Sequence, residues 1–200
     1  MIKAVFLDKD GTLVKNVPYN VTPELIELDE EAVDALRLLQ QQNFLLVVVS
    51  NQAGIAKGYF DEKALQTANT HIASLLAAQG IQIDAFYYCP HHPDGIIVEY
   101  AVKCDCRKPA PGLLLQAAEK LEIDLAGSWM IGDILDDVDA GHRAGCRSIL
   151  YDNGNETKWE KDNKYREPDY TVNSLYKAAQ IICGASELKL ESHEALAGEL

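Results

Sequence analysis

The sequence is poor in basic residues. Its 18 Lys and Arg stand against 31 Asp and Glu, which gives a formal net charge of -13 at pH 7. Affinity for nucleic acids and anionic membrane surfaces comes mostly from Lys and Arg that neutralise phosphates, so neither is an expected partner. A small phosphorylated metabolite would need positive charge gathered locally, from a metal ion and a few basic side chains.

Long apolar runs are also missing. No stretch approaches the roughly 18 apolar residues of a membrane helix. Residues 1–6 enter a strand-like segment without the apolar region and cleavage site of a signal peptide. We therefore expect a cytoplasmic protein, in a compartment that keeps thiols reduced. Three of the five cysteines, Cys89, Cys104 and Cys106, are close in sequence, which in that compartment favours a metal site over a disulfide.

The sequence contains neither internal repeats nor a low-complexity linker. Its 200 residues, 48% of them hydrophobic, are enough for one α/β core and short for two domains with a linker. We expect a monomer with a single domain over residues 1–184, which includes a long loop at 89–111 rich in Cys, His, Pro and Gly. Residues 185–200 form an acidic tail with little apolar face, which predicts a frayed helix or disorder.

Short apolar runs alternate with helical patterns along the chain. The runs predict strands at residues 5–7, 44–49, 83–88, 129–131, 148–151 and 170–172. The patterns between them predict helices at residues 30–41, 61–79, 112–121, 137–144 and 174–183. This alternation indicates an α/β fold with a doubly wound, mainly parallel sheet and helices on both faces. Ligands bind beyond the carboxyl ends of such strands, so the residues that end the runs should share one crevice: Asp8, Asp10, Ser50 and Asp133.

Two carboxylates follow the first predicted strand, in the segment Asp8-Lys9-Asp10-Gly11-Thr12. Because strand side chains alternate with a period of two, Asp8 and Asp10 face the same side. One carboxylate can attack phosphorus to form an acyl phosphate, and the second can protonate the leaving oxygen and later deprotonate water. Gly11 gives the backbone freedom to turn away from a ligand. The pair therefore indicates phosphoryl-transfer chemistry.

A phosphoryl group carries negative charge that repels an attacking carboxylate, so positive charge must already be in place. Asp133, at another strand end, is expected to share Mg²⁺ with Asp8 and a backbone carbonyl. Lys108, just before a predicted helix, is the best candidate for a second cation. The Ser50 hydroxyl can hydrogen-bond a transferring phosphoryl oxygen. Each feature alone is common at protein surfaces, but their occurrence together at predicted strand ends points to a phosphate site.

Four segments carry a family resemblance: Phe6-Leu7-Asp8-Lys9-Asp10-Gly11-Thr12, Val49-Ser50-Asn51-Gln52, Arg107-Lys108-Pro109 and Ile131-Gly132-Asp133. In this order they resemble the four motifs of the haloacid dehalogenase superfamily of phosphatases, over about residues 1–150. The resemblance implies the Rossmann-like fold of that superfamily, with Asp8 as nucleophile and Asp10 as general acid and base. It further implies that Ser50 and Lys108 hold the phosphoryl group. Mg²⁺ would be bound by Asp8, the Asp10 carbonyl and Asp133.

A second pattern is Cys89-Pro90-His91-His92-Pro93 followed by Cys104-Asp105-Cys106-Arg107-Lys108-Pro109. It is similar to the subgroup of this superfamily that contains heptose 1,7-bisphosphate phosphatases and histidinol-phosphate phosphatases. The resemblance implies loops in place of a large cap domain, and Zn²⁺ on Cys89, His91, Cys104 and Cys106. Three thiolates and one imidazole form a closed set, which is typical of structural zinc. His92 is the nearby alternative, and the subgroup pattern favours His91.

The subgroup resemblance implies hydrolysis of heptose 1,7-bisphosphate to heptose 1-phosphate through an aspartyl phosphate. The second phosphate needs its own cation, and Arg107 suits it because a guanidinium binds phosphate oxygens in a two-pronged way. Zinc would support recognition, because the ligand Cys106 directly precedes Arg107 and Lys108. The resemblance also implies a substrate rim, with Lys57 as a further candidate, made of Asn16, Tyr19, Asn51 and Gln52.

Two positions depart from the heptose pattern. Ile134 stands where these enzymes often carry a basic residue, and Ala53 stands where a hydroxyl is common. Both leave the reaction class intact and keep histidinol phosphate, or another sugar phosphate, open as the substrate. Histidinol phosphate has one phosphate and a cationic end that an acidic protein would attract.

Two other classes of function stay open. A phospho-accepting receiver module also has an acidic pocket with a hydroxyl and a Lys, but receivers accept phosphate on a different strand from their paired acids. A purely structural zinc-binding adaptor would leave Asp8, Ser50, Lys108 and Asp133 unexplained. Asp137 lies at a predicted helix start, where an acid suits the helix dipole, and it could also reach water on the metal.

Overall fold

The structure is a computed structural model that describes residues 2–156 and 159–184. One six-stranded sheet runs through it in the order β3-β2-β1-β4-β5-β6, and every neighbouring pair is parallel. The strands are β1 (Ala4–Leu7), β2 (Leu45–Asn51), β3 (Ala85–Cys89), β4 (Trp129–Gly132), β5 (Arg147–Tyr151) and β6 (Tyr170–Val172). The predicted doubly wound parallel sheet is thus confirmed. The predicted tail at 185–200 lies outside the described residues.

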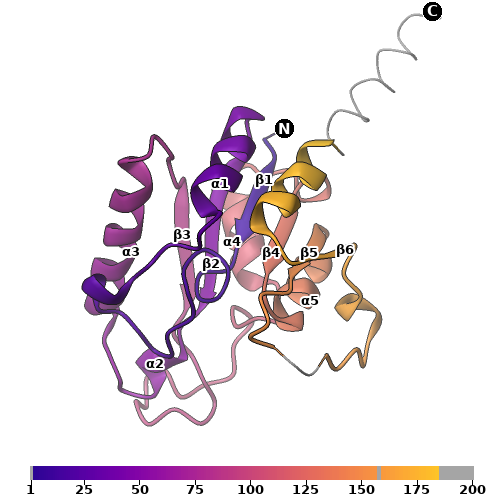
Figure 1. The fold of residues 1–200 in the computed structure, drawn as a ribbon. Coiled ribbons are helices and arrows are strands. Elements are labelled where there is room, and N and C mark those ends of the chain that lie inside the picture. Colours follow the sequence, from indigo (N-terminus) through magenta and orange to yellow (C-terminus); the bar gives the residue numbers. More distant parts are fainter. Residues whose placement is uncertain (1, 157–158, 185–200) are drawn as a thin grey trace, which may run out of the picture.

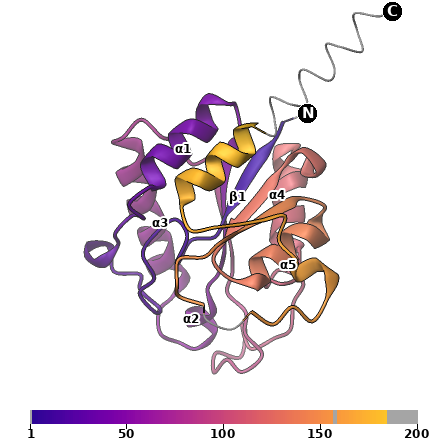
Figure 2. The same cartoon turned by 45° about the vertical axis from the view of Figure 1, so that its right-hand side comes forward.

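Helices cover both faces of the sheet (Figures 1 and 2). The four residues of β1 are all buried and alternate between two hydrophobic clusters, because successive strand side chains point to opposite faces. Val5 and Leu7 pack toward α1 (Ala32–Gln41), α3 (Glu62–Ala77) and the helix at 175–184. Ala4 and Phe6 pack toward α4 (Gly112–Leu121) and α5 (Leu135–Ala144). Burial on both faces explains why the strands read as continuous apolar runs.

Some element boundaries differ from the predicted ones for identifiable reasons. β2 includes Ser50 and Asn51, because β3 pairs alongside them up to Cys89. α5 begins at Leu135, two residues before the predicted start, and the Asp137 carboxylate accepts a hydrogen bond from the Ile134 N–H at 3.3 Å. Short elements that the sequence patterns do not predict are α2 (Ala53–Ala56) and the 3-10 turns Pro23–Leu25, Leu125–Gly127 and Lys164–Arg166.

The chain crosses over at the centre of the sheet. From β1 it moves outward through β2 and β3, and then returns to β4 on the other side of β1. The carboxyl ends of β1 and β4 therefore lie side by side, and the Asp8 N–H donates to the Ile131 carbonyl at 2.9 Å. Such a crossover point is where doubly wound sheets bind ligands.

Loops cover this end of the sheet, at the lower edge of Figure 1. Residues 8–31, between β1 and α1, contain one 3-10 turn, and residues 90–111, between β3 and α4, contain no helix or strand. The expected absence of a large cap domain is confirmed for these connections. Among the described residues, none of the helices has both the length and the apolar character needed to cross a membrane.

Candidate active site

Three carboxylates converge where β1 and β4 end. Asp8 follows β1, Asp133 follows β4, and Asp137 lies in the first turn of α5. Each offers an oxygen within 4.8 Å of the others, and all three residues are buried. The topology brings them together, because α5 starts directly after β4 and so places its amino end beside the end of β1. The predicted meeting of Asp8 and Asp133 is confirmed as geometry, and Asp137 joins them.

The Lys108 side chain fills the space between these acids. It is 2% exposed, and its Nζ lies 2.5 Å from the Asp8 Oδ1, 2.5 Å from the Asp137 Oδ1 and 2.9 Å from the Val49 carbonyl. Burial alone lowers the pKa of the ammonium, but the adjacent Asp137 and Asp8 carboxylates outweigh this effect and raise the pKa above its ordinary value. Lys108 is therefore a fixed positive charge beside Asp8.

Asn51 holds the backbone of Lys108 in place. Its side-chain Nδ2 donates to the Lys108 carbonyl and its Oδ1 accepts from the Lys108 N–H, both at 3.0 Å. Residue 51 ends β2, so these two bonds fasten the loop at 90–111 to the sheet. The predicted role of Asn51 is a substrate-rim contact; its amide here has an internal partner on each side, and the substrate contact stays a prediction.

Asp10 has its own partners at the crevice. The Lys9 Nζ, itself buried, lies 3.1 Å from the Asp10 Oδ1, and the Gln52 Nε2 donates to the Asp10 Oδ2 at 2.9 Å. The same Gln52 amide lies 2.7 Å from the Ser50 Oγ. Burial and the nearby Asp8 charge raise the pKa of Asp10, although Lys9 opposes the shift. A raised pKa suits a carboxyl that must give up a proton.

The carboxylate cluster fits a divalent cation. Against the three negative charges of Asp8, Asp133 and Asp137, Lys108 supplies one positive charge, which leaves two to be balanced. Burial, followed by the Asp8 charge, raises the pKa of Asp133 to about 6. Burial likewise raises the pKa of Asp137 to about 8, against the effect of Lys108. Carboxylate oxygens are the ligands that Mg²⁺ prefers, and it would remove this repulsion.

These pKa values predict how the metal-free protein responds to pH. The unfolded carboxyls titrate near 3.8, so between about pH 4 and 8 the folded state binds more protons than the unfolded state. The unfolding temperature without Mg²⁺ should therefore fall as pH rises from 6 to 8, and saturating Mg²⁺ should flatten the slope. Thermal unfolding at several pH values measures this, with Asp137→Asn as the control that reduces the slope. A metal-free unfolding temperature that rises over this range would contradict the prediction.

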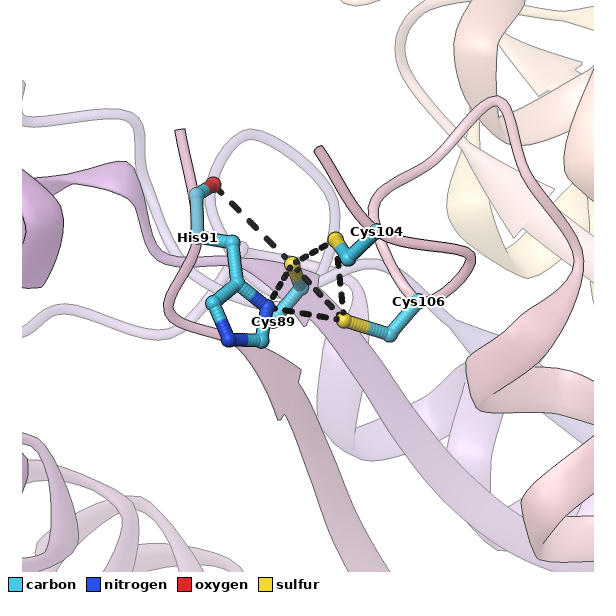
Figure 3. A group of neighbouring side chains, drawn as sticks. All are labelled: Cys89, His91, Cys104 and Cys106. Carbon is cyan, nitrogen blue, oxygen red and sulfur yellow. Dashed lines mark hydrogen bonds between the residues drawn. The ribbon is translucent and has the colours of Figure 1, made fainter. Parts of the chain in front are cut away.

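Four side chains from the end of β3 and the following loop point toward one another (Figure 3): Cys89, His91, Cys104 and Cys106. The three Sγ atoms lie 3.0 to 3.5 Å apart, and the His91 Nδ1 is 3.3 Å from the Cys106 Sγ. Zinc–sulfur bonds of about 2.3 Å would set tetrahedral sulfurs about 3.8 Å apart, so a small outward movement would admit the ion. His92 lies outside this group, and its Nδ1 accepts from the Asp94 N–H at 3.1 Å.

The sulfur cluster is tied directly to the carboxylate site. The Cys89 carbonyl accepts from the Gln52 N–H at 2.8 Å, and Gln52 contacts Asp10. On the other side, the Arg107 Nη1 donates to the His91 carbonyl at 3.5 Å. Burial raises the pKa of the Cys89 thiol, so a metal would have to displace its proton. The cluster is thus linked to Asp10 through Cys89 and Gln52, and to Arg107 through the loop at 90–111.

The predicted rim residues do not all lie together. The Tyr19 hydroxyl accepts from the Lys57 Nζ at 2.8 Å, and the Tyr19 ring packs edge-on against Tyr59. Asn16 lines a cavity of about 490 Å³ with Asp29, Tyr151 and Asn153 among others. Arg107 bonds to the His91 carbonyl. The structure therefore brings Tyr19 and Lys57 into contact, and the substrate contacts of Asn16, Tyr19, Lys57 and Arg107 stay predictions.

Three residues at the site have contacts that the sequence patterns do not predict. The patterns place Asp137 at a helix start from which it could reach water on the metal, and the structure shows it buried and paired with Lys108. The feature of the sequence that could have indicated this is that Asp137 comes four residues after Asp133, about one helical turn beyond the end of a strand. The sequence patterns give Lys9 no role beyond separating Asp8 from Asp10, but in the structure it is buried and pairs with Asp10. Asn153 follows β5 and has no sequence signal, although its Nδ2 lies 3.3 Å from the Asp133 Oδ2.

Comparisons with known proteins agree with this geometry. A family model described as HAD-hydrolase-like matches residues 105–178, and one described as mitochondrial PGP phosphatase matches residues 1–78. The D-glycero-beta-D-manno-heptose-1,7-bisphosphate 7-phosphatase of Escherichia coli K12 is 40% identical over 184 residues, which cover 90% of this chain and 94% of that protein. The enzyme of the same name from Pasteurella multocida is 38% identical over 187 residues, which cover 92% and 98%.

A solved structure has the same fold. The crystal structure of D,D-heptose 1,7-bisphosphate phosphatase from B. bronchiseptica, complexed with magnesium and phosphate, matches with a TM-score of 0.79 and 30% identity. The match covers 92% of this chain and 99% of that one. Identity at this level over nearly the whole of each protein goes well beyond a shared sheet topology. The chain belongs to the haloacid dehalogenase superfamily of phosphatases, in the family that includes the heptose-1,7-bisphosphate phosphatases.

Proposed function

We propose that this chain is a Mg²⁺-dependent phosphatase that hydrolyses D-glycero-D-manno-heptose 1,7-bisphosphate to heptose 1-phosphate and phosphate. The observation that carries the proposal is the contact of Asp8 with a buried Lys108, beside two further carboxylates at the crossover of the sheet. The named relatives support the sugar, because they are similar along almost the entire chain. Arg107, on the loop next to Lys108, would supply the cation for the second phosphate.

In the first half of the reaction an Asp8 carboxylate oxygen attacks phosphorus, and the bond from phosphorus to the sugar oxygen breaks. Asp10 gives its proton to that oxygen, which leaves as the sugar hydroxyl. In the second half Asp10 takes a proton from water, the water oxygen attacks phosphorus, and the bond to Asp8 breaks to release phosphate. Lys108 and the Ser50 hydroxyl hold the phosphoryl oxygens.

Bound Mg²⁺, on Asp8, the Asp10 carbonyl and Asp133, would neutralise charge on the phosphoryl group. Asp137 would help to position Lys108 for this step, because the Lys108 ammonium contacts both Asp137 and Asp8. The raised pKa of Asp10 supports its part as the acid in the first half of the reaction. These roles stand or fall together, because each assumes that the phosphoryl group of the substrate binds beside Asp8.

Phosphate release from a panel of substrates tests the proposal. The panel contains heptose 1,7-bisphosphate, heptose 7-phosphate, histidinol phosphate and a simple hexose phosphate, each with and without Mg²⁺. We expect heptose 1,7-bisphosphate to have the highest kcat/KM, and Mg²⁺ to be required throughout. A preference for histidinol phosphate would keep the mechanism and overturn the substrate. Release that does not depend on Mg²⁺ would overturn the mechanism.

Zinc on Cys89, His91, Cys104 and Cys106 is a further part of the proposal, in a structural role that supports substrate recognition. Thiolate and imidazole ligands with no carboxylate among them suit Zn²⁺ rather than Mg²⁺. The ion would hold the loop that carries Arg107 and Lys108, and would act on the reaction only through their positions.

Loss of zinc is therefore expected to raise KM more than it lowers kcat. In Cys104→Ser the zinc content should fall, KM for the bisphosphate should rise about tenfold, and the unfolding temperature should drop. Metal analysis, steady-state kinetics and thermal unfolding measure the three effects. Cys146→Ala is the matched control, because Cys146 is buried outside the cluster and its loss should leave the zinc content unchanged. Unchanged KM in a zinc-free, folded protein would contradict the proposed role.

A further inference from the structure

Asn153 reaches the carboxylate site from an element that the proposed mechanism does not use. It lies in the segment that follows β5, 20 residues from Asp133 and 142 residues from Gly11. Its side-chain Nδ2 donates to the Gly11 carbonyl in a short hydrogen bond and lies 3.3 Å from the Asp133 Oδ2. One amide group thus contacts both the turn after Asp10 and a predicted metal ligand.

The orientation of this amide is set by all of its partners together. The Asn153 Oδ1 accepts from the Asn155 N–H at 2.8 Å, so the NH₂ group must point the other way. There it meets a carbonyl and a carboxylate, which are both acceptors. The opposite orientation would set two oxygens against the Asn153 oxygen and leave the Asn155 N–H facing a donor. The backbone is also held, since the Asn153 N–H donates to the Tyr151 carbonyl at 3.0 Å.

The two groups that Asn153 joins are packed directly on each other. Gly11 has a φ of +93°, in the region that favours glycine, and a Cβ at this position would overlap the Asp133 carboxylate. The turn at Gly11 therefore lies against Asp133 with no side chain between them. A donor on the Asp133 Oδ2 limits rotation of that carboxylate and so determines where its Oδ1 lies. The donor on the Gly11 carbonyl holds the Gly11–Thr12 peptide, which is the next one along the chain after the peptide that carries the Asp10 carbonyl.

We propose that Asn153 is a positioning residue for the metal site, which holds the Asp133 carboxylate and the Asp10–Gly11 turn in their binding geometry. The inference rests on the proposed function, because it takes Asp133 and the Asp10 carbonyl as Mg²⁺ ligands. A hydrogen bond from outside the ligand set orients a metal-binding carboxylate, and losing such a partner weakens metal binding. The hydrogen bonds of Asn153 go to Gly11, Asp133, Asn155 and Tyr151 and not to Asp8, so we expect it to act on Mg²⁺ affinity rather than on the chemical steps.

Mg²⁺ titration without substrate, by calorimetry on the full-length protein, tests this inference. Asn153→Ala removes the amide, and Asn153→Leu removes it while keeping the same branched arrangement of heavy atoms. In both variants we expect the Kd for Mg²⁺ to rise about tenfold, while kcat at saturating Mg²⁺ stays within about threefold of the wild-type value. Asn155→Ala is the matched control: its side chain is exposed in the same segment, and its backbone N–H still binds Asn153.

Asp133→Asn is the reference variant that distinguishes failure of the inference about Asn153 from failure of the proposed metal site. If Asp133→Asn weakens Mg²⁺ binding and both Asn153 variants bind Mg²⁺ within about twofold of wild type, the inference about Asn153 is overturned and the proposed metal site stands. A lower unfolding temperature at unchanged Kd would also overturn it, because Asn153 would then serve packing alone. If Asp133→Asn leaves Mg²⁺ binding unchanged, the proposed metal site itself fails.

Discussion

Asp8→Asn is expected to lower kcat at least about 10,000-fold while the protein stays folded. A neutral amide cannot attack phosphorus as the carboxylate does, and no other carboxylate can replace it without a change of backbone position. Asn has nearly the same size as Asp and can still accept a hydrogen bond from Lys108, whose Nζ lies 2.5 Å from the Asp8 Oδ1. Phosphate release at saturating Mg²⁺ measures the effect, and circular dichroism verifies the fold.

Asp10→Asn separates the two halves of the same mechanism. In the proposed mechanism this change keeps the nucleophile and removes the acid and base. An aryl phosphate, whose leaving group needs little protonation, should therefore still phosphorylate Asp8. Breakdown of the aspartyl phosphate should then be slow, and rapid acid quenching should trap phosphorylated protein. Asp8→Asn should yield none under the same conditions. Full turnover by Asp8→Asn would end the proposal that Asp8 is the nucleophile.

Lys108→Met is expected to have the second-largest effect, with kcat/KM reduced about 1,000-fold. Met fills a similar space without charge, so the phosphoryl oxygens lose a fixed cation. In the Mg²⁺-free protein the change should also lower the unfolding temperature, because it leaves Asp8 and Asp137 buried without their shared partner. Steady-state kinetics and thermal unfolding with and without Mg²⁺ measure both effects. Lys108→Arg should not restore activity, because the larger planar guanidinium cannot replace an ammonium in this buried space.

A double substitution separates stability from catalysis at this position. Adding Asp137→Asn to Lys108→Met removes the buried charge that the first change leaves unpaired. We expect the double variant to recover part of the lost unfolding temperature and none of the lost activity. If Lys108→Met unfolds at the wild-type temperature without Mg²⁺, the Lys108–Asp137 pair does not have the electrostatic role that its geometry indicates.

Much of the site can be predicted from the sequence, because polar residues at the ends of parallel strands must meet at one edge of the sheet. Asp8, Ser50 and Asp133 each lie at or directly after a buried apolar run, and the crossover of the sheet brings them together. Lys108 is different. It lies in a loop, and only a motif implies its position; the tertiary structure places it through the side chain of Asn51.

The same reasoning does not find the contact of Asp137 with Lys108, or the contacts of Asn153. An acid in the first turn of a helix looks the same in sequence whether it only caps the helix or faces a buried lysine 29 residues away. Asn153 follows β5, where an Asn before Gly154 indicates a turn and nothing more. The sequence resemblance assigns Gln52 and Asn51 to substrate contact, which stays a prediction; only the structure shows that their amides bond to Asp10, Ser50 and Lys108.

The sequence by itself determined which chemical groups are present and that the strands carrying them end at one edge of a sheet, because alternation of apolar runs and helices indicates parallel strands. Only the tertiary structure decided which of those groups touch, since contact depends on the path of loops whose sequences carry no periodic signal. The loop at 90–111 and the segment after β5 show this most clearly. Side chains such as Lys108 and Asn153 reach the same few ångströms of space from distant parts of the chain, and long-range packing alone brings them there.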